Sequence, residues 1–376
     1  MRDFFDLLKM AVDKKASDVF ISVGTPPSLK IDGQILPLKV DPLTHTVARE
    51  MAFSVMTERQ KKEYDEKKDC NFALVPPAFP GRFRMNVFQQ QGMVGLVGRR
   101  ISDEIPNFAD LRLPSAPMEK ISLAKRGLVL FVGGTGSGKS TSQAACIDYR
   151  NQHTRGHIIT IEDPVEYTHV PKHCIITQRE VGIDTESFGS ALENAMRQSP
   201  DVIQIGEIRT SETMENALSF AETGHLCLAT LHANNAYQAV ERMSNLYPDT
   251  NREQVMMGIS LNLRAIISQR LIPLAEGGGR VAAVEVMICT TFVRDLIMKG
   301  EIDRLGEAIE NSSESGMQTF DQSLFGLHEA DLITRDDALR NAESASNLGL
   351  RFKLEGKSAQ SAKNLGSTFE NVEVGL

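Results

Sequence analysis

One short segment combines glycines, a lysine and a hydroxyl residue at a fixed spacing. Residues 133–140 read GGTGSGKS and match the pattern G-x(4)-G-K-[ST]. Glycines allow backbone N–H groups to approach phosphate oxygens closely, and the N-terminus of a following helix adds partial positive charge. Lys139 would then reach the β- and γ-phosphates, and Ser140 would offer its hydroxyl to Mg²⁺. This pattern predicts a phosphate-binding loop, with an ordinary Gly-rich turn as the alternative.

The surroundings of the loop favour phosphate binding over a simple turn. The apolar run LVLFV precedes it and a helical pattern follows it, which is the context that a phosphate-binding loop requires. We therefore expect ATP and Mg²⁺ as cofactors. The residues expected to hold the triphosphate are Gly133, Gly134, Thr135, Gly136, Ser137, Gly138, Lys139, Ser140 and Thr141.

Polar side chains follow three further apolar runs. Glu162 and Asp163 come after HIITI, Glu207 follows VIQI and a glycine, and His232 follows LCLATL. Ligands of open α/β sheets bind outside the carboxyl ends of the strands. Glu162 and Glu207 are therefore candidates to hold the metal or to orient the attacking water, and His232 to sense the γ-phosphate. The alternative is that each is a solvated loop residue, and for His225 that it is a structural histidine bonding a neighbouring loop.

Short apolar runs alternate with helical stretches in this part of the chain, which predicts a parallel sheet of an α/β domain. The expected strands are 128–132, 157–161, 202–205 and 226–230, and the expected helices are about 186–198 and 211–222. After residue 235 the pattern is mostly helical, with one strand at 281–287. Gln204 is a polar residue inside an otherwise apolar strand, and the pattern gives it no role.

The first hundred residues have a different pattern, typical of an α+β domain with an antiparallel sheet. The N-terminal segment MRDFFDLLKMAVDKK has apolar residues at helical spacing. A hairpin is expected over 29–38 around Asp32-Gly33, and a helix capped by Thr57 follows. Residues 82–88 alternate strictly, which places Arg82 and Arg84 on one strand face.

These patterns divide the chain into domains. We expect an N-terminal domain over 1–101, a linker rich in Pro, Ser and acids over 102–116, and the phosphate-loop domain with a helical C-terminal part over 117–353. Residues 354–376 are polar and lack periodicity, which predicts a disordered tail.

Composition excludes several classes of function. Its 376 residues contain no run of 18 apolar residues, so no membrane span is expected, and the N-terminus lacks the features of a signal peptide. The five cysteines form no CxxC pair, which argues against zinc and favours a reduced, cytoplasmic location. A net charge of −8 argues against nucleic acid as a partner.

The motifs together resemble those of the secretion ATPase superfamily. ITIEDPVEY (159–167) resembles its Asp box, DVIQIGEIR (201–209) its atypical Walker B segment, and TGHLCLATLHANNA (223–236) its His box. GRFRMNVF (81–88) and GMQTFDQSLF (316–325) resemble segments of the type IV pilus retraction motors, the PilT/PilU family. RGHIITIEDPVEYTH and CIITQREVG are most similar to its PilU branch, and the match covers nearly the whole chain.

This resemblance implies a RecA-like P-loop ATPase domain joined to a smaller PAS-like α+β domain, in a ring of six with nucleotide between the two domains. It implies that Glu162 is the catalytic base or water positioner and Glu207 the Walker B acid near Mg²⁺. His225 and His232 would link the phosphate to domain movement.

The same resemblance assigns a role to arginines of the N-terminal domain, which in such motors reach the γ-phosphate. Arg82 and Arg84 match these arginines, and Arg99 or Arg100 is a candidate third. Their alternative is a solvated basic edge.

One segment departs from the PilT pattern. PilT-type motors carry Ala-Ile-Arg-Asn-Leu-Ile-Arg-Glu, a segment needed for retraction. The matching TFVRDLIMKGE (291–301) keeps Arg294 and Leu296-Ile297 but loses the rest. This favours the PilU branch and puts autonomous retraction in doubt. The four-cysteine zinc module of some assembly and secretion ATPases is absent, which argues against that branch.

The expected function is a hexameric, ATP-hydrolysing motor in the cytoplasm, peripheral at the inner membrane, that acts on a platform protein of the type IV pilus. A sister PilT-type ATPase is a further candidate partner. Two alternatives remain open: a DNA-translocating or conjugation-type ATPase, and a nucleotide-binding accessory subunit with little turnover of its own.

Overall fold

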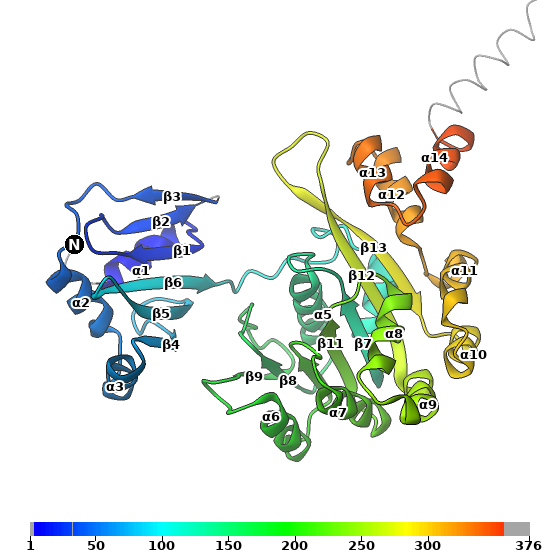
Figure 1. Cartoon of the computed structure of the whole chain (residues 1–376), viewed down its shortest axis with the longest axis horizontal. Coiled ribbons are helices and arrows are strands. Elements are labelled where there is room, and N and C mark those ends of the chain that lie inside the picture. The colour runs from blue at the N-terminus through cyan, green and yellow to red at the C-terminus, as the bar shows by residue number, and fades with distance from the viewer. Residues whose placement is uncertain (1–3, 32, 357–376) are drawn as a thin grey trace, which may run out of the picture. The chain divides into compact units, whose positions relative to one another are not determined.

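The computed structural model describes residues 4–31 and 33–356, and the chain forms two compact units (Figure 1). Among the described residues, unit 1 comprises those up to Ile105 with two short later segments, Pro164–Val170 and Gly182–Asp184, and unit 2 comprises the others. The sequence-based division cut the chain into continuous ranges, so it could not place these two later segments in the N-terminal domain. The expected disordered tail lies outside the described residues from position 357 onward, as does Asp32 of the expected hairpin turn.

Unit 1 is built on a six-stranded antiparallel sheet with the order β3-β2-β1-β6-β5-β4. Its elements are α1 (Phe4–Asp13), β1 (Asp18–Ile21), β2 (Ser28–Ile31), β3 (Gln34–Pro37), α2 (His45–Ser54), α3 (Glu58–Lys67), β4 (Asp69–Leu74), β5 (Arg82–Gln90) and β6 (Met93–Ile101). Apolar side chains of α1, α2 and one sheet face form its core. The α+β prediction is confirmed, and Thr57 and Gln60 form a capping box at α3.

Unit 2 is built on a seven-stranded sheet with the order β13-β12-β7-β11-β10-β8-β9, parallel except for β13. Its strands are β7 (Gly127–Val132), β8 (His157–Glu162), β9 (Ile175–Glu180), β10 (Val202–Ile205), β11 (Leu226–Leu231), β12 (Leu263–Pro273) and β13 (Arg280–Ile288). Its first helices are α4 (Ser115–Ser122), α5 (Lys139–His153), α6 (Phe188–Ala195), α7 (Ser211–Glu222), α8 (Ala236–Asn245) and α9 (Arg252–Asn262). The central strands β7 and β11 are buried along their whole length, as the apolar runs predict.

Up to residue 356, the C-terminal part of unit 2 adds five α-helices: α10 (Thr291–Lys299), α11 (Leu305–Glu310), α12 (Phe320–Glu329), α13 (Arg335–Asn341) and α14 (Ala345–Leu354). Figure 1 shows β12 and β13 as a long hairpin with α12, α13 and α14 grouped near it. These helices share a small core with the hairpin, including Ile272, Val281 and Phe320. None of the helices in the described ranges has the length and apolar composition needed to cross a bilayer.

Two strands of unit 2 differ from the sequence-based expectation. The region after residue 235 contains β12 as well as β13, so the prediction of a single strand there is wrong. β12 follows α9 without a loop, and Ser268 and Gln269 interrupt its apolar run although both are buried. β9 was not predicted either, because it is an edge strand whose side chains are largely half-exposed and polar.

Candidate nucleotide site

The loop between β7 and α5 requires glycine for steric reasons. Gly133, Gly136 and Gly138 have φ values of 152°, 73° and 94°, in the region that L side chains rarely adopt. A Cβ atom on Gly133 would lie 2.4 Å from Ser137 Oγ and 2.6 Å from the carbonyl oxygen of Gln269. The loop shape therefore depends on this glycine in particular.

Lys139 lies folded back onto this loop. Its Nζ donates to the carbonyl oxygens of Gly133, at 3.0 Å, and Gly134, at 2.8 Å. Burial lowers the pKa of Lys139, and the negative charge of Glu207 opposes that shift. Both acceptors are neutral carbonyls, so phosphate oxygens, which bind an ammonium group more strongly, can replace them.

The start of α5 points its backbone donors toward the same space. Gly138 is the N-cap and provides no side chain to satisfy the first N–H groups of this 15-residue helix. Ser137 Oγ is buried and has no hydrogen-bond partner among the described residues. Ser140 and Thr141, in the first turn, are half-buried. These unused donors fit an anion, and the Ser140 hydroxyl with the Glu207 carboxylate offers the oxygen ligands that Mg²⁺ prefers.

Two carboxylates stand at the ends of adjacent parallel strands. Glu162 is the last residue of β8, is 5% exposed, and accepts a hydrogen bond from Thr160 Oγ1 at 2.7 Å. Glu207 lies just beyond β10, which pairs with β8. Gly206 lets the two chain segments approach, because a Cβ on it would lie 3.2 Å from the Cα of Glu162. The sheet therefore brings both predicted acids to one edge.

Glu207 contacts two further polar side chains at this edge. His232 Nε2 lies 3.1 Å from Glu207 Oε1, and Arg209 donates to Glu207 Oε2 at 2.8 Å from Nε and 2.7 Å from Nη2. His232 follows β11, whose last residue pairs with Val132 directly before the phosphate loop. Lys139, Glu162, Glu207 and His232 therefore belong to one cluster at the carboxyl ends of the strands.

His225 does not belong to this cluster. It precedes β11, and Leu226 pairs with Gly127 at the opposite edge of the sheet. The six strand residues between the histidines span about 20 Å at roughly 3.3 Å per residue. His225 Nδ1 lies 3.1 Å from Thr223 Oγ1 and 3.2 Å from the carbonyl oxygen of Phe220. Within the chain, its surroundings fit the structural alternative and not contact with the phosphate loop.

Arg82 and Arg84 lie on one face of β5 in unit 1, and both are half-buried. The strand register separates the two candidates for a third arginine. Arg99 pairs with Arg84 and shares its face, whereas Arg100 pairs with the fully buried Phe83. The register therefore favours Arg99. These arginines belong to unit 1 and the phosphate loop to unit 2, so a meeting at the nucleotide stays a prediction.

Two hollows adjoin the phosphate loop, and the sequence motifs did not reveal either. A cavity of about 330 Å³ borders Gly138 and Thr141; among the side chains around it are Leu111, Arg112, Leu113, Leu271 and Leu274. The leucine side chains in its walls suit the flat ring of a nucleotide base. A second cavity, of about 620 Å³ and more open to solvent, extends from Gly133 past His232 to α8. The apolar residues in the stretch FADLRLP are the one local sign of the first cavity.

The structure also accounts for Gln204. Its Nε2 donates to Oε1 of Gln143 at 3.0 Å, and both side chains are buried. Gln143 lies on α5, the helix that follows the phosphate loop. The buried amide pair therefore ties β10, which carries Glu207 at its end, to that helix.

The chain belongs to the type II/IV secretion system protein family, whose model its sequence matches over residues 2–331. Within that class it is 51% identical to the type IV pilus ATPase PilU of Pseudomonas aeruginosa, over 95% of this chain and 93% of that protein. It is 39% identical to the type IV pilus retraction ATPase PilT of the same organism, over 92% of this chain and 99% of that protein.

A solved structure agrees with this family membership. The crystal structure of the pilus retraction motor PilT with bound ADP matches with a TM-score of 0.83 at 42% identity, over 90% of this chain and 96% of that chain. The predicted family and the RecA-like α/β fold with an N-terminal domain are thereby confirmed. The higher identity to PilU than to PilT agrees with the branch that the motifs indicated.

Proposed function

We propose that this chain is an Mg²⁺-dependent ATPase of the type IV pilus that drives or supports pilus retraction and twitching motility. The observation that carries the proposal is the cluster of Lys139, Glu162, Glu207 and His232 around a glycine-dependent loop. The ATPase class follows from the family and from similarity to PilU and PilT along nearly the whole chain.

Each residue of the cluster has a role that its position supports. The loop amides and Lys139 bind the triphosphate, and the Ser140 hydroxyl and Glu207 hold the metal. Mg²⁺ supplies positive charge that neutralises phosphate oxygens. Glu162 is the group that orients the attacking water and accepts its proton, since its carboxylate is almost fully shielded from solvent at the strand end. His232 is hydrogen-bonded to Glu207 and contacts the terminal phosphate of the bound nucleotide.

The proposal extends to the assembly. The functional assembly is a homohexamer, in which Arg82, Arg84 and Arg99 of the N-terminal domain bind the terminal phosphate. The partners are a platform protein of the inner membrane and a sister PilT-type ATPase, and the chain works at the cytoplasmic face of that membrane. The net charge of −8 favours this function over DNA translocation.

The segment that departs from PilT supports an accessory role. It forms α10, in which Leu296 and Ile297 are buried and Arg294 Nε donates to the carbonyl oxygen of Ser260 at 2.9 Å. Of the residues shared with PilT, Leu296 and Ile297 therefore pack inward, whereas Arg294 is exposed. Phe292 and Met298, which differ from the PilT pattern, are each about half exposed, at 52% and 51%. A changed outer face is consistent with retraction that needs a sister motor.

Steady-state phosphate release tests the enzymatic part. Wild type should hydrolyse ATP with Mg²⁺, whereas Lys139→Ala and Glu207→Ala should lose at least about 100-fold in kcat. Glu355→Gln, which removes one carboxylate of an exposed ion pair with Arg351, is the matched control and should retain activity. Equal phosphate release from all four proteins would reject the catalytic proposal.

Deleting the gene and scoring pilus number and surface motility tests the cellular part. Loss of motility with pili retained is the outcome expected of a retraction motor. Loss of the pili themselves would point instead to pilus assembly.

A further inference from the structure

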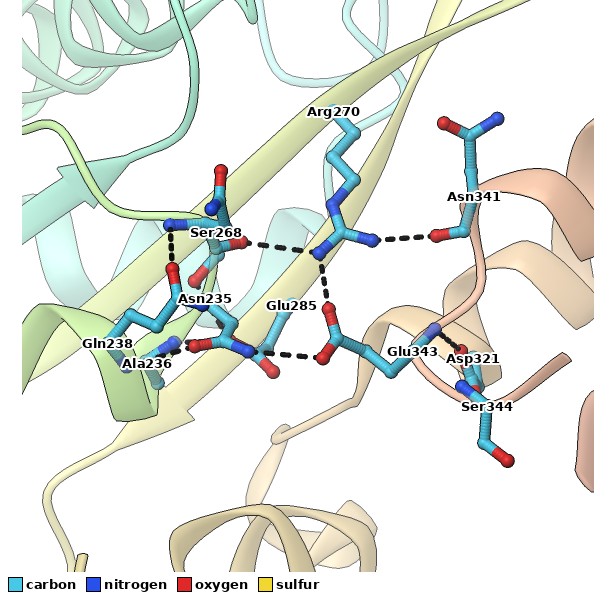
Figure 2. A network of polar contacts seen from close by, with 11 residues as sticks. Asn235, Ala236, Gln238, Ser268, Arg270, Glu285, Asp321, Asn341, Glu343 and Ser344 are labelled. Carbon is cyan, nitrogen blue, oxygen red and sulfur yellow. Dashed lines mark hydrogen bonds and ion pairs between the residues drawn. The ribbon is translucent and has the colours of Figure 1, made fainter. Parts of the chain in front are cut away.

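The loop that follows His232 is held at three consecutive residues (Figure 2). The carbonyl oxygen of Asn234 accepts from Arg270 Nη2 at 3.5 Å. Asn235 Nδ2 donates to Glu343 Oε2 at 3.1 Å. The backbone N–H of Ala236 donates to Glu285 Oε1 at 2.7 Å. The chain from His232 to these contacts is only two to four residues long, so the contacts limit where the imidazole can lie.

The groups that hold the loop come from distant parts of the chain. Arg270, on β12, forms an ion pair with Glu343 and donates from Nη1 to the carbonyl oxygen of Asn341 at 2.6 Å. Its guanidinium also lies over the ring of Phe320, 4.1 Å from the centroid. The segment between α13 and α14 is thereby joined to the sheet and, through it, to the loop of His232.

The backbone of this segment has its own anchor. Both carboxylate oxygens of Asp321, on α12, accept backbone N–H groups, from Glu343 at 2.7 Å and from Ser344 at 3.0 Å. The Glu343 side chain is therefore not needed to hold its own segment in place. Its carboxylate instead contacts Arg270, 73 positions away in the sequence, and Asn235, 108 positions away.

Glu285 completes the arrangement from β13. It is 5% exposed, and its Oε1 accepts from both the Ala236 N–H and Ser268 Oγ, the latter at 2.8 Å. Burial raises the pKa of Glu285 to about 7; its two hydrogen bonds oppose the shift, and of the nearby charges Glu343 adds to it and Arg270 opposes it. A buried carboxylate is costly unless it has partners, and the Ala236 N–H of the loop is one of the two donors that Glu285 has here.

We propose that Glu343 and Arg270 are positioning residues that keep His232 against Glu207 beside the phosphate loop. Through them the C-terminal helices α12, α13 and α14 are coupled to the nucleotide site. The Glu343 side chain is 39% exposed and borders a cavity of about 650 Å³, so its contact with the loop can open without unpacking the core. The inference rests on the proposed function, because it gives these residues an effect on hydrolysis.

Two substitutions weaken the contact and leave the neighbouring backbone anchors in place. Glu343→Gln removes the charge that pairs with Arg270, and leaves the Asp321 anchor of the backbone intact. Asn235→Asp replaces the amide that donates to Glu343 with a repelling carboxylate. It keeps the Oδ1 that caps α8 by accepting from the Gln238 N–H at 2.9 Å.

Each variant should lower kcat about tenfold and leave the dissociation constant of a fluorescent ATP analogue unchanged, because the loop amides and Lys139 are untouched. The decisive readout is the combination with His232→Ala. If Glu343 acts through His232, the double variant should be no slower than His232→Ala alone. A merely structural role would make the two losses multiply. Glu355→Gln is the control and should match wild type.

Normal kcat in both Glu343→Gln and Asn235→Asp would overturn the inference. So would multiplying losses with His232→Ala, or a His232→Ala variant of normal activity. If wild type shows turnover that depends on Lys139 and the Glu343 variant equals it, the inference alone fails. If wild type shows no turnover dependent on Lys139, the proposed function fails and the inference fails with it.

Discussion

His232 and His225 stand at the two ends of the same strand, β11, and their surroundings differ in kind. His232 contacts Glu207 beside the phosphate loop. The loop that follows His232 is held by hydrogen bonds at three consecutive residues. His225 lies edge-on to the Phe220 ring, with centroids 6.4 Å apart, and bonds its own turn. Only seven positions separate them in the sequence, but strand polarity sends them to opposite edges of the sheet. We therefore expect His232 to contribute to ATP hydrolysis and His225 to contribute to the stability of the fold.

The largest effect should come from the buried acid at the carboxyl edge. Glu162→Gln keeps the shape of the side chain but removes the carboxylate that we propose accepts a proton from water. We expect kcat to fall by about 1,000-fold with nucleotide binding retained. Single-turnover hydrolysis and binding of a fluorescent ATP analogue measure the two quantities separately. A Glu162→Gln enzyme with more than about a tenth of wild-type kcat would remove this residue from the chemistry.

The two histidines provide the sharpest test of the difference between the edges. His232→Ala should lower kcat about tenfold with little change in the free energy of unfolding. His225→Ala should leave kcat unchanged and cost about 1 kcal/mol of stability, because it loses a hydrogen bond and a ring contact. Phosphate release and denaturant unfolding measured on both variants decide the matter. The reverse pattern, with His225 affecting kcat and His232 affecting stability, would contradict the assignment.

An effect that depends on pH concerns the buried carboxyl of Glu285, behind the loop of His232. The folded-state pKa of Glu285, about 7, is raised above its ordinary value of 4.5, so folding favours the protonated form. Its contribution to stability is full below about pH 4.5 and is lost as pH rises toward and through 7. Relative to Glu285→Gln, wild type should lose up to about 3 kcal/mol of unfolding free energy over this window.

Urea unfolding of both proteins between pH 5 and pH 8 measures this difference. Other carboxylates titrate in both proteins and cancel in the comparison. A difference that stays constant over this range would mean that Glu285 has an ordinary pKa in the folded protein.

Local patterns explain what the sequence could predict. The phosphate loop, its glycines and the acids at the strand ends follow from short motifs and from the rule that parallel strands end at one edge. The face shared by Arg82 and Arg84 followed from alternation along one strand. Choosing Arg99 over Arg100 needed the register between β5 and β6, which the sequence of either strand alone does not contain.

The features that the sequence did not reveal depend on long-range contacts. β12 is buried between β13 and β7 despite Ser268 and Gln269, because both side chains find tertiary partners: Glu285 accepts from Ser268 Oγ, and Gln269 Nε2 donates to Ser142 Oγ. Glu343 reaches Asn235 only because α12 and the β12–β13 hairpin place them together. No periodicity or local spacing carries information of that kind.

The most direct test of the account is a structure of the wild-type protein with Mg²⁺ and a non-hydrolysable ATP analogue. We predict that Lys139 Nζ leaves the carbonyl oxygens of Gly133 and Gly134 for the phosphates. The terminal phosphate should lie within hydrogen-bond reach of His232, with Glu162 and Glu207 on the same side. A nucleotide bound away from residues 133–140, or a triphosphate closer to His225 than to His232, would contradict it.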